Sequence, residues 1–157
     1  MKTTKLYIAV VFLLALAAAA CSSGGGVAKV NTDSGGKAVR GYDTVSLFDG
    51  KTLTGDPSLS YAWNGATWLF SSWENLAKFK ADPEAYAPQF GGYCSYAVSH
   101  GYTADGDPNT AKIVDGKLYL NYNQKAKEAW EEEQDKFIRD GDRNWIEFQT
   151  HKPEHKN

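Results

Sequence analysis

Residues 59–70 read LSYAWNGATWLF, and they decide the fold because they carry the strongest local signal in the chain. Large apolar side chains alternate with small ones as far as Trp63, which is the pattern of a strand with one buried face. The dipeptide Asn64-Gly65 comes next, and it is preferred in the type I′ turns that join two strands. The apolar run at 67–70 completes a predicted β-hairpin.

Further strands are predicted on both sides of this hairpin. Residues 111–114 and 117–122 flank the turn dipeptide Asp115-Gly116, which predicts a second hairpin. Upstream, the stretch Val39–Phe48 also reads as a strand, because it is largely apolar and ends at the turn dipeptide Asp49-Gly50. Together these strands predict a small antiparallel sheet made of hairpins.

Apolar residues at helical spacing predict helices after each hairpin. One helix is expected from Trp73 to the stop signal Asp82-Pro83, with a further turn of helix over 83–86. A longer C-terminal helix begins after Asn123 and is expected to break near Gly141. The predicted fold class is α+β, with helices packed on the sheet of hairpins. No internal repeat is visible in the sequence.

The N-terminus has the three parts of a secretory signal. Two lysines precede the apolar run 6–16, and four alanines come directly before Cys21. This order predicts a signal peptide over 1–20 whose removal leaves Cys21 as a lipid-bearing, palmitate-type first residue. An ordinary signal peptide, with Cys21 merely nearby, is the less favoured alternative. We therefore expect a lipoprotein of the cell envelope, and Ser22 favours the outer membrane, facing the periplasm, if the cell is Gram-negative.

The remaining 137 residues suit one small domain with one core. Residues 21–38 are rich in glycine and serine and predict a flexible tether, 39–148 the folded domain, and 149–157 a polar tail. Without the two signal lysines the chain has 15 basic and 19 acidic residues, a formal charge of −4. This balance argues against nucleic acid as a partner.

A set of short motifs resembles the YHS domain family, whose members are small metal-associated modules related to the TRASH domains. The pattern Phe70-x-Ser72, then Phe79, then Asp82-Pro83-x-x-Tyr86 carries the resemblance. Further pieces that look like the secreted branch of that family bring the coverage to most of 39–148. These pieces are Gly41-Tyr42-Asp43, Gly91-Gly92-Tyr93-Cys94 and residues 113–122.

The chain departs from the family pattern at the metal ligands. Positions that hold cysteine in metal-binding members hold Ser46, Ser71 and Asn75 here. Hydroxyls and an amide cannot form a cage of soft thiolates. The remaining thiol is Cys94, which the resemblance implies lies beside these three positions.

Cys94 and His100 form the only soft-ligand pair of the predicted mature domain, and they could converge if the backbone turns between them. A thiolate with an imidazole suits Cu(I) or Zn(II), and Asp43 could add an oxygen ligand. We therefore expect a copper or zinc ion held mainly by Cys94. The alternative for Cys94 is a small buried hydrophobe, for His100 a packing histidine, and for Asp43 a hydrogen bond to local backbone.

Two other functional classes stay open. The first is a metal-free structural or interaction module that binds a protein partner in the envelope, and the second is a redox protein with a single thiol. An enzyme is not favoured, because the chain has no phosphate loop, no HExxH, no Gly-x-Ser-x-Gly and no Cys-x-x-Cys. The acidic run 131–133 reads as a solvated helix face.

The lipidation prediction can be tested directly in cells. Metabolic labelling with a palmitate analogue should mark the chain, and Cys21→Ser should abolish the label and release the protein from the membrane fraction. Cys94→Ser is the matched control and should keep the label. Labelling that persists in Cys21→Ser would contradict the lipoprotein assignment.

Overall fold

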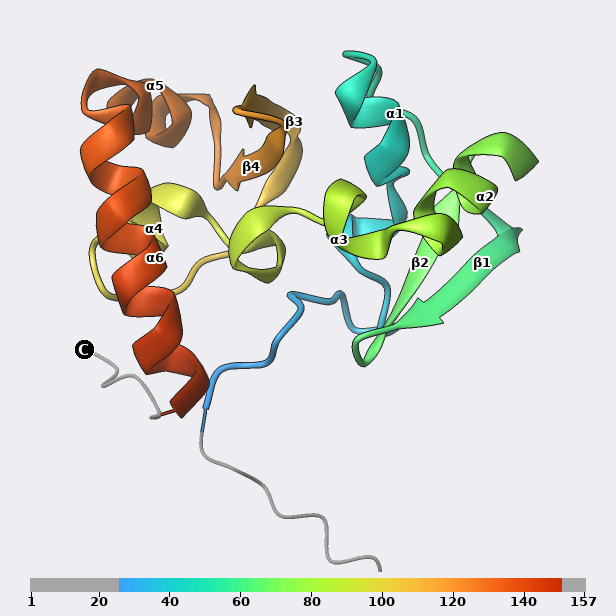
Figure 1. Ribbon diagram of the computed structural model, residues 1–157, viewed down its shortest axis with the longest axis horizontal. Coiled ribbons are helices and arrows are strands. Elements are labelled where there is room, and N and C mark those ends of the chain that lie inside the picture. Colours follow the sequence, from blue (N-terminus) through green and yellow to red (C-terminus); the bar gives the residue numbers. More distant parts are fainter. Residues whose placement is uncertain (1–25, 151–157) are drawn as a thin grey trace, which may run out of the picture.

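The computed structural model describes residues 26–150, so the predicted signal peptide and Cys21 lie outside the described residues. The predicted α+β class is confirmed (Figure 1): the described part of the chain has two antiparallel two-stranded sheets, with helices packed around them. The predicted C-terminal helix is also present. No helix among the described residues is long and apolar enough to cross a membrane.

The first half of the fold contains the hairpin that the sequence predicts most strongly. Its strands pair with Trp63 opposite Ala66, and Asn64 and Gly65 both have positive φ, as a type I′ turn requires. The elements of this half are a 3-10 turn η1 (Val39–Gly41), α1 (Thr44–Phe48), β1 (Asp56–Trp63), β2 (Ala66–Phe70), α2 (Trp73–Ala81) and α3 (Pro83–Tyr86).

The second half has the same kinds of element in the same order. The predicted hairpin around Asp115-Gly116 is confirmed, with Val114 opposite Lys117. The elements are η2 (Gln89–Gly92), α4 (Ser95–Ser99), β3 (Asp107–Val114), β4 (Lys117–Asn121), α5 (Gln124–Glu132) and α6 (Gln134–Thr150). Figure 1 shows the two halves side by side, the first half in blue to green and the second in yellow to red.

The two halves are copies of one structural unit, so the view that the sequence holds no internal repeat is wrong. A constant spacing of 51 residues relates them, from η1 and η2 through to Tyr86 and Phe137. The residues that are identical at this spacing are Gly41 and Gly92, Tyr42 and Tyr93, Gly50 and Gly101, Thr52 and Thr103, Gly55 and Gly106, Asp56 and Asp107, Pro57 and Pro108, Gly65 and Gly116, and Leu69 and Leu120.

The backbone hydrogen bonds repeat with the sequence. The amide of Asp43 donates to the carbonyl of Leu53 over 2.8 Å, and the amide of Cys94 donates to Ala104 over the same distance. Helix caps repeat as well, because Ser72 caps α2 and Asn123 caps α5 through the side-chain oxygen. The two halves therefore share backbone hydrogen bonds and helix caps as well as turn residues.

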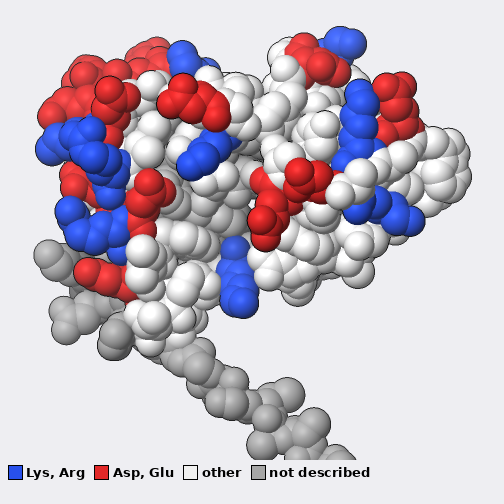
Figure 2. All heavy atoms as spheres, viewed as in Figure 1, with Lys and Arg blue, Asp and Glu red and all other residues white. Residues whose placement is uncertain are grey.

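The repeat explains where the C-terminal helical region breaks. We expected the break near Gly141, but α6 runs through that residue, and the interruption lies at Glu133, the counterpart of Asp82 between α2 and α3. Gly141 has a packing role instead, since a Cβ there would lie 2.7 Å from the ring of Phe90. Within the acidic run 131–133, Glu132 and Glu133 are exposed as expected, while Glu131 is half-buried and pairs with Lys112 at 3.1 Å. Figure 2 shows acidic side chains gathered over this end of α5.

Two further predictions about the first 48 residues are wrong. The stretch Val39–Phe48 is no strand, because Asp43 accepts hydrogen bonds from the amides of Val45 and Ser46 and so starts helix α1. Of the tether predicted over 21–38, the described part contacts the domain at several points: Val27 packs on the buried residues of the second half, Val30 and Ala38 are buried, and the amide of Ala38 donates to Thr67. Residues 149 and 150 of the predicted tail 149–157 belong to α6, and 151–157 lie outside the described residues.

Buried apolar residues form two clusters in the described chain, so the expected single core is wrong. The first cluster centres on Trp68 and Phe79, and the second on Trp130 and Tyr119. Strand β4 joins them, because Leu118 and Leu120 pack into the first cluster and Tyr119 between them packs into the second. Strand β4 thus contributes side chains to the buried clusters of both units.

Each unit has a glycine where two backbone segments lie close together, so adding a side chain at either glycine should destabilise the fold to a similar extent. An added Cβ at Gly55 would collide with Leu69, and one at the counterpart Gly106 would collide with the carbonyl of Gly92. Gly55→Ala and Gly106→Ala should each lower the free energy of unfolding by about 3 kcal/mol in chemical denaturation. Gly35→Ala, whose Cβ meets only side-chain atoms, is the control and should change it by less than about 0.5 kcal/mol. Equal losses of unfolding free energy at all three positions would contradict the matched close contacts at Gly55 and Gly106.

Candidate functional site

Cys94 is buried at the start of helix α4, where its side chain caps the helix. Its Sγ accepts a hydrogen bond from the amide of Ala97 at 3.5 Å and lies 3.8 Å from Oδ1 of Asn121. Asn121 is itself fully buried, and its Oδ1 also accepts from the amide of Tyr96 at 3.0 Å. Cys94 is therefore fixed by α4 and by the end of β4, with only 1% of its surface exposed.

A pocket of about 360 Å³ opens over this thiol. Its walls are mainly apolar, and Tyr102 and Tyr122 at the wall are about half exposed, at 49% and 56%. Among the described residues, Lys125 is the only charged one in the lining. The lining residues are Cys94, Tyr96, Ala97, Tyr102, Ala104, Tyr122, Asn123, Lys125, Ala126 and Ala129.

The counterpart of Cys94 in the first half is Asp43, and its surroundings are closed. The carboxylate is fully buried and accepts from five donors. Oδ1 accepts from the two amides at the start of α1, while Oδ2 accepts from the amide and hydroxyl of Ser71 at 2.8 and 2.6 Å and from Nδ2 of Asn75 at 2.7 Å. Every lone pair of Asp43 is thus used inside the fold.

The residues that close the site in the first half are exchanged in the second. Ser71 corresponds to Tyr122 and Asn75 corresponds to Ala126, both of which line the pocket. The second half therefore has a thiol in place of the carboxylate, and its Ala126 has no hydrogen-bonding side chain to fill the space. The pocket lies where the first unit holds its hydrogen-bonded cluster.

The structure does not bring the three predicted metal ligands together. Cys94 caps the N-terminus of α4 and His100 lies at its C-terminus, where Nδ1 is 2.8 Å from the carbonyl oxygen of Tyr96 and the imidazole stacks on the Tyr96 ring at 4.2 Å. Asp43 belongs to the other half. Over residues 26–150 no group of three or more His, Cys, Asp and Glu side chains is placed to hold a metal ion.

The positions that the YHS resemblance treats as former metal ligands surround Asp43 instead of Cys94. Ser71 and Asn75 donate to its carboxylate, and the hydroxyl of Ser46 donates to its carbonyl at 2.7 Å. The implied neighbourhood of Cys94 is therefore wrong, because Cys94 holds the equivalent position in the second unit. Aligning the chain with itself at the 51-residue spacing would have given this result from the sequence.

Burial raises the pKa of the Cys94 thiol above its ordinary value of 9.0, although hydrogen bonds from backbone amides such as that of Ala97 act in the opposite direction. The thiol is consequently neutral at physiological pH. A neutral, buried thiol is a poor nucleophile. This environment suits a contact surface for a ligand better than it suits covalent chemistry.

No family model, curated protein or solved structure matches the chain.

The raised pKa of Cys94 predicts its reactivity and its effect on stability. In a Cys21→Ser background at pH 8, Ellman's reagent should modify Cys94 at least about tenfold more slowly in the folded than in the unfolded chain. The unfolded thiol ionises first as pH rises above about 9, so the free energy of unfolding should fall by up to about 1.4 kcal/mol per pH unit relative to Cys94→Ala. Modification of Cys94 in the folded chain at pH 8 as fast as in the unfolded chain would show that the thiol is neither buried nor neutral.

Proposed function

We propose that this protein is a binding protein of the cell envelope, anchored by lipid at Cys21, whose second unit holds a small aromatic anion in the pocket over Cys94. One observation carries the proposal. The pocket lies at the place that the first unit fills with the hydrogen-bonded cluster of Asp43, Ser71 and Asn75. A space that opens in the second unit over a fixed side chain, where the first unit is filled by hydrogen-bonded side chains, is suited to a ligand.

The lining indicates the chemistry of that ligand. Tyrosine rings and alanine methyls offer apolar contact, and a volume of about 360 Å³ fits a small molecule. Lys125 adds one positive charge, and none of the described residues that line the pocket is acidic. A ligand with an aromatic or short acyl body and one carboxylate, sulfonate or phosphate group matches both features.

The thiol serves in this proposal as part of the apolar wall. Its sulfur is soft and polarizable, and it contacts rings well without being ionised. Its low exposure and raised pKa support reversible binding over catalysis. The proposal thus favours the interaction module over the redox protein among the classes that the sequence left open.

The predicted copper or zinc ion does not fit the residues around Cys94. Closed zinc sites use four ligands, and copper(I) prefers several soft ones. Within residues 26–150, the pocket lining offers a single thiol, with neither a histidine nor a carboxylate beside it. Metal binding at Cys94, the YHS family assignment and the envelope location remain predictions from the sequence.

The ligand class can be tested with 8-anilinonaphthalene-1-sulfonate, an aromatic anion whose fluorescence rises in apolar sites. The chain from residue 21 onward should bind one equivalent with a dissociation constant on the order of tens of micromolar, from about 0.3 kcal/mol per non-hydrogen atom. Ala126→Leu should abolish binding because the leucine fills the pocket. Lys125→Glu should weaken binding about fivefold, because it replaces an attractive charge by a repulsive one.

Lys51→Glu makes the same charge change in the first half and should leave the affinity unchanged. Equal binding by wild type and Ala126→Leu would overturn the proposal. A parallel titration with Cu(I) and Zn(II) under reducing conditions tests the metal prediction. Tight metal binding that is lost in Cys94→Ala, without binding of the aromatic anion, would replace the proposed ligand by a metal ion.

A further inference from the structure

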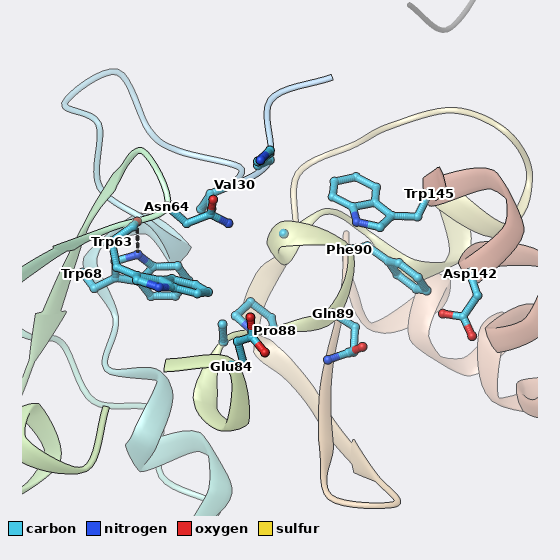
Figure 3. Close-up of a pocket in the computed structure, with 13 residues that line it drawn as sticks. Val30, Trp63, Asn64, Trp68, Glu84, Pro88, Gln89, Phe90, Asp142 and Trp145 are labelled. Carbon is cyan, nitrogen blue, oxygen red and sulfur yellow. Dashed lines mark hydrogen bonds between the residues drawn. The ribbon is translucent and has the colours of Figure 1, made fainter. Parts of the chain in front are cut away.

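A second cavity lies between the two units, away from Cys94, and Figure 3 shows it. Its volume is about 380 Å³. Trp63 and Trp68 from the first hairpin form one wall, while Phe90 and Trp145 form the opposite wall. Neither unit could form this cleft alone, because each contributes one aromatic wall.

The tryptophans of the cleft are held in position by other rings. Trp63 packs at 5.7 Å from Trp68 and 5.8 Å from Phe79, and the indole nitrogen of Trp68 donates to the carbonyl of Trp63. On the other wall, Trp145 packs at 6.2 Å from Phe90 and 5.9 Å from Tyr93. A ligand would meet preorganised aromatic surfaces, and little ordering would be needed on binding.

The N-terminal segment fixes the distance between the walls. The amide of Asn31 donates to the carbonyl of Gly91 at 2.8 Å, and Val30 beside it is buried. Gly91 has φ of 61° and lies so close to Lys29 that a side chain would collide with the Lys29 backbone. The segment expected to be a tether therefore forms part of the cleft.

Five polar side chains line the cleft, and their hydrogen-bonding capacity is free. Within the described residues none of them makes a side-chain hydrogen bond or an ion pair. They include amides, which both donate and accept, carboxylates, which accept, and an ammonium, which donates. Figure 2 shows acidic and basic side chains bordering the region where the two halves meet. The five are Lys29, Asn64, Glu84, Gln89 and Asp142.

We propose that this cleft binds a saccharide, with a sugar ring seated between Trp63 and Trp145 and its hydroxyls bonded to the polar side chains. The C–H faces of a pyranose are apolar and pack on indole rings, while its hydroxyls both donate and accept hydrogen bonds. Amides and carboxylates together satisfy such mixed groups. A cation would also pack on the tryptophans. Because Glu84 and Asp142 outnumber Lys29 in the lining, a cation is the competing ligand that the test includes.

Calorimetric titration of the chain from residue 21 onward with triacetylchitotriose and with maltotriose tests this proposal. At least one of these sugars should bind with a dissociation constant below about 1 mM and should shift the tryptophan fluorescence. Trp145→Ala should weaken that binding at least about tenfold, as loss of one aromatic wall implies. Glu84→Ala removes a carboxylate from the lining, so it should weaken binding. Because Glu84 is exposed, the melting temperature should stay unchanged.

Trp73→Ala is the matched control, because Trp73 is 73% exposed on α2 and does not line the cleft. It should bind the sugar as the wild type does. Absence of binding by both sugars at about 10 mM, or binding that neither Trp145→Ala nor Glu84→Ala weakens, would overturn the proposal. Binding of tetramethylammonium in place of sugar would also overturn it, since the cleft would then be a cation site. Binding of anilinonaphthalene sulfonate at Cys94 is independent of each of these results.

Discussion

The carboxylate of Asp43 is the contact on which the first unit depends. It starts helix α1 through two backbone amides, and it ties that helix to the end of β2 through Ser71 and to α2 through Asn75. A buried carboxylate is tolerated only when its lone pairs are satisfied, and here five donors meet it. The hairpin packs against α2, and α3 follows it with Asp82 as its N-cap.

The second unit keeps the junction but changes its chemistry. Cys94 caps α4 as Asp43 caps α1, yet a thiol accepts weakly and needs no cluster of donors. Tyr122 and Ala126 could therefore replace the serine and the asparagine without leaving a buried charge unpaired. The space that results is the pocket, while β4 and the N-terminal segment keep the two units at a fixed distance and so create the cleft.

The sequence predicts the parts of this fold that depend on neighbouring residues. Both hairpins follow from Asn64-Gly65 and Asp115-Gly116, and the end of α2 follows from Asp82-Pro83. The repeat is hard to see because its identities fall mostly at turns, while buried pairs such as Phe79 and Trp130 differ in size. Cys94 stands out as a lone thiol, but its pocket depends on Ala126, whose role is evident only beside its counterpart. Neither His100 nor Asp43 lies beside Cys94, and the spacing of these residues in the sequence does not reveal this.

If three side-chain exchanges convert the closed cluster of the first unit into a ligand pocket in the second, the reverse exchange should close that pocket. The variant Cys94→Asp, Tyr122→Ser, Ala126→Asn gives the second unit the cluster of the first. The measurement is titration of this variant with 8-anilinonaphthalene-1-sulfonate, with its circular dichroism as the check on folding. We predict a folded protein that no longer binds the anion. A folded variant that binds it as tightly as the wild type would contradict the account.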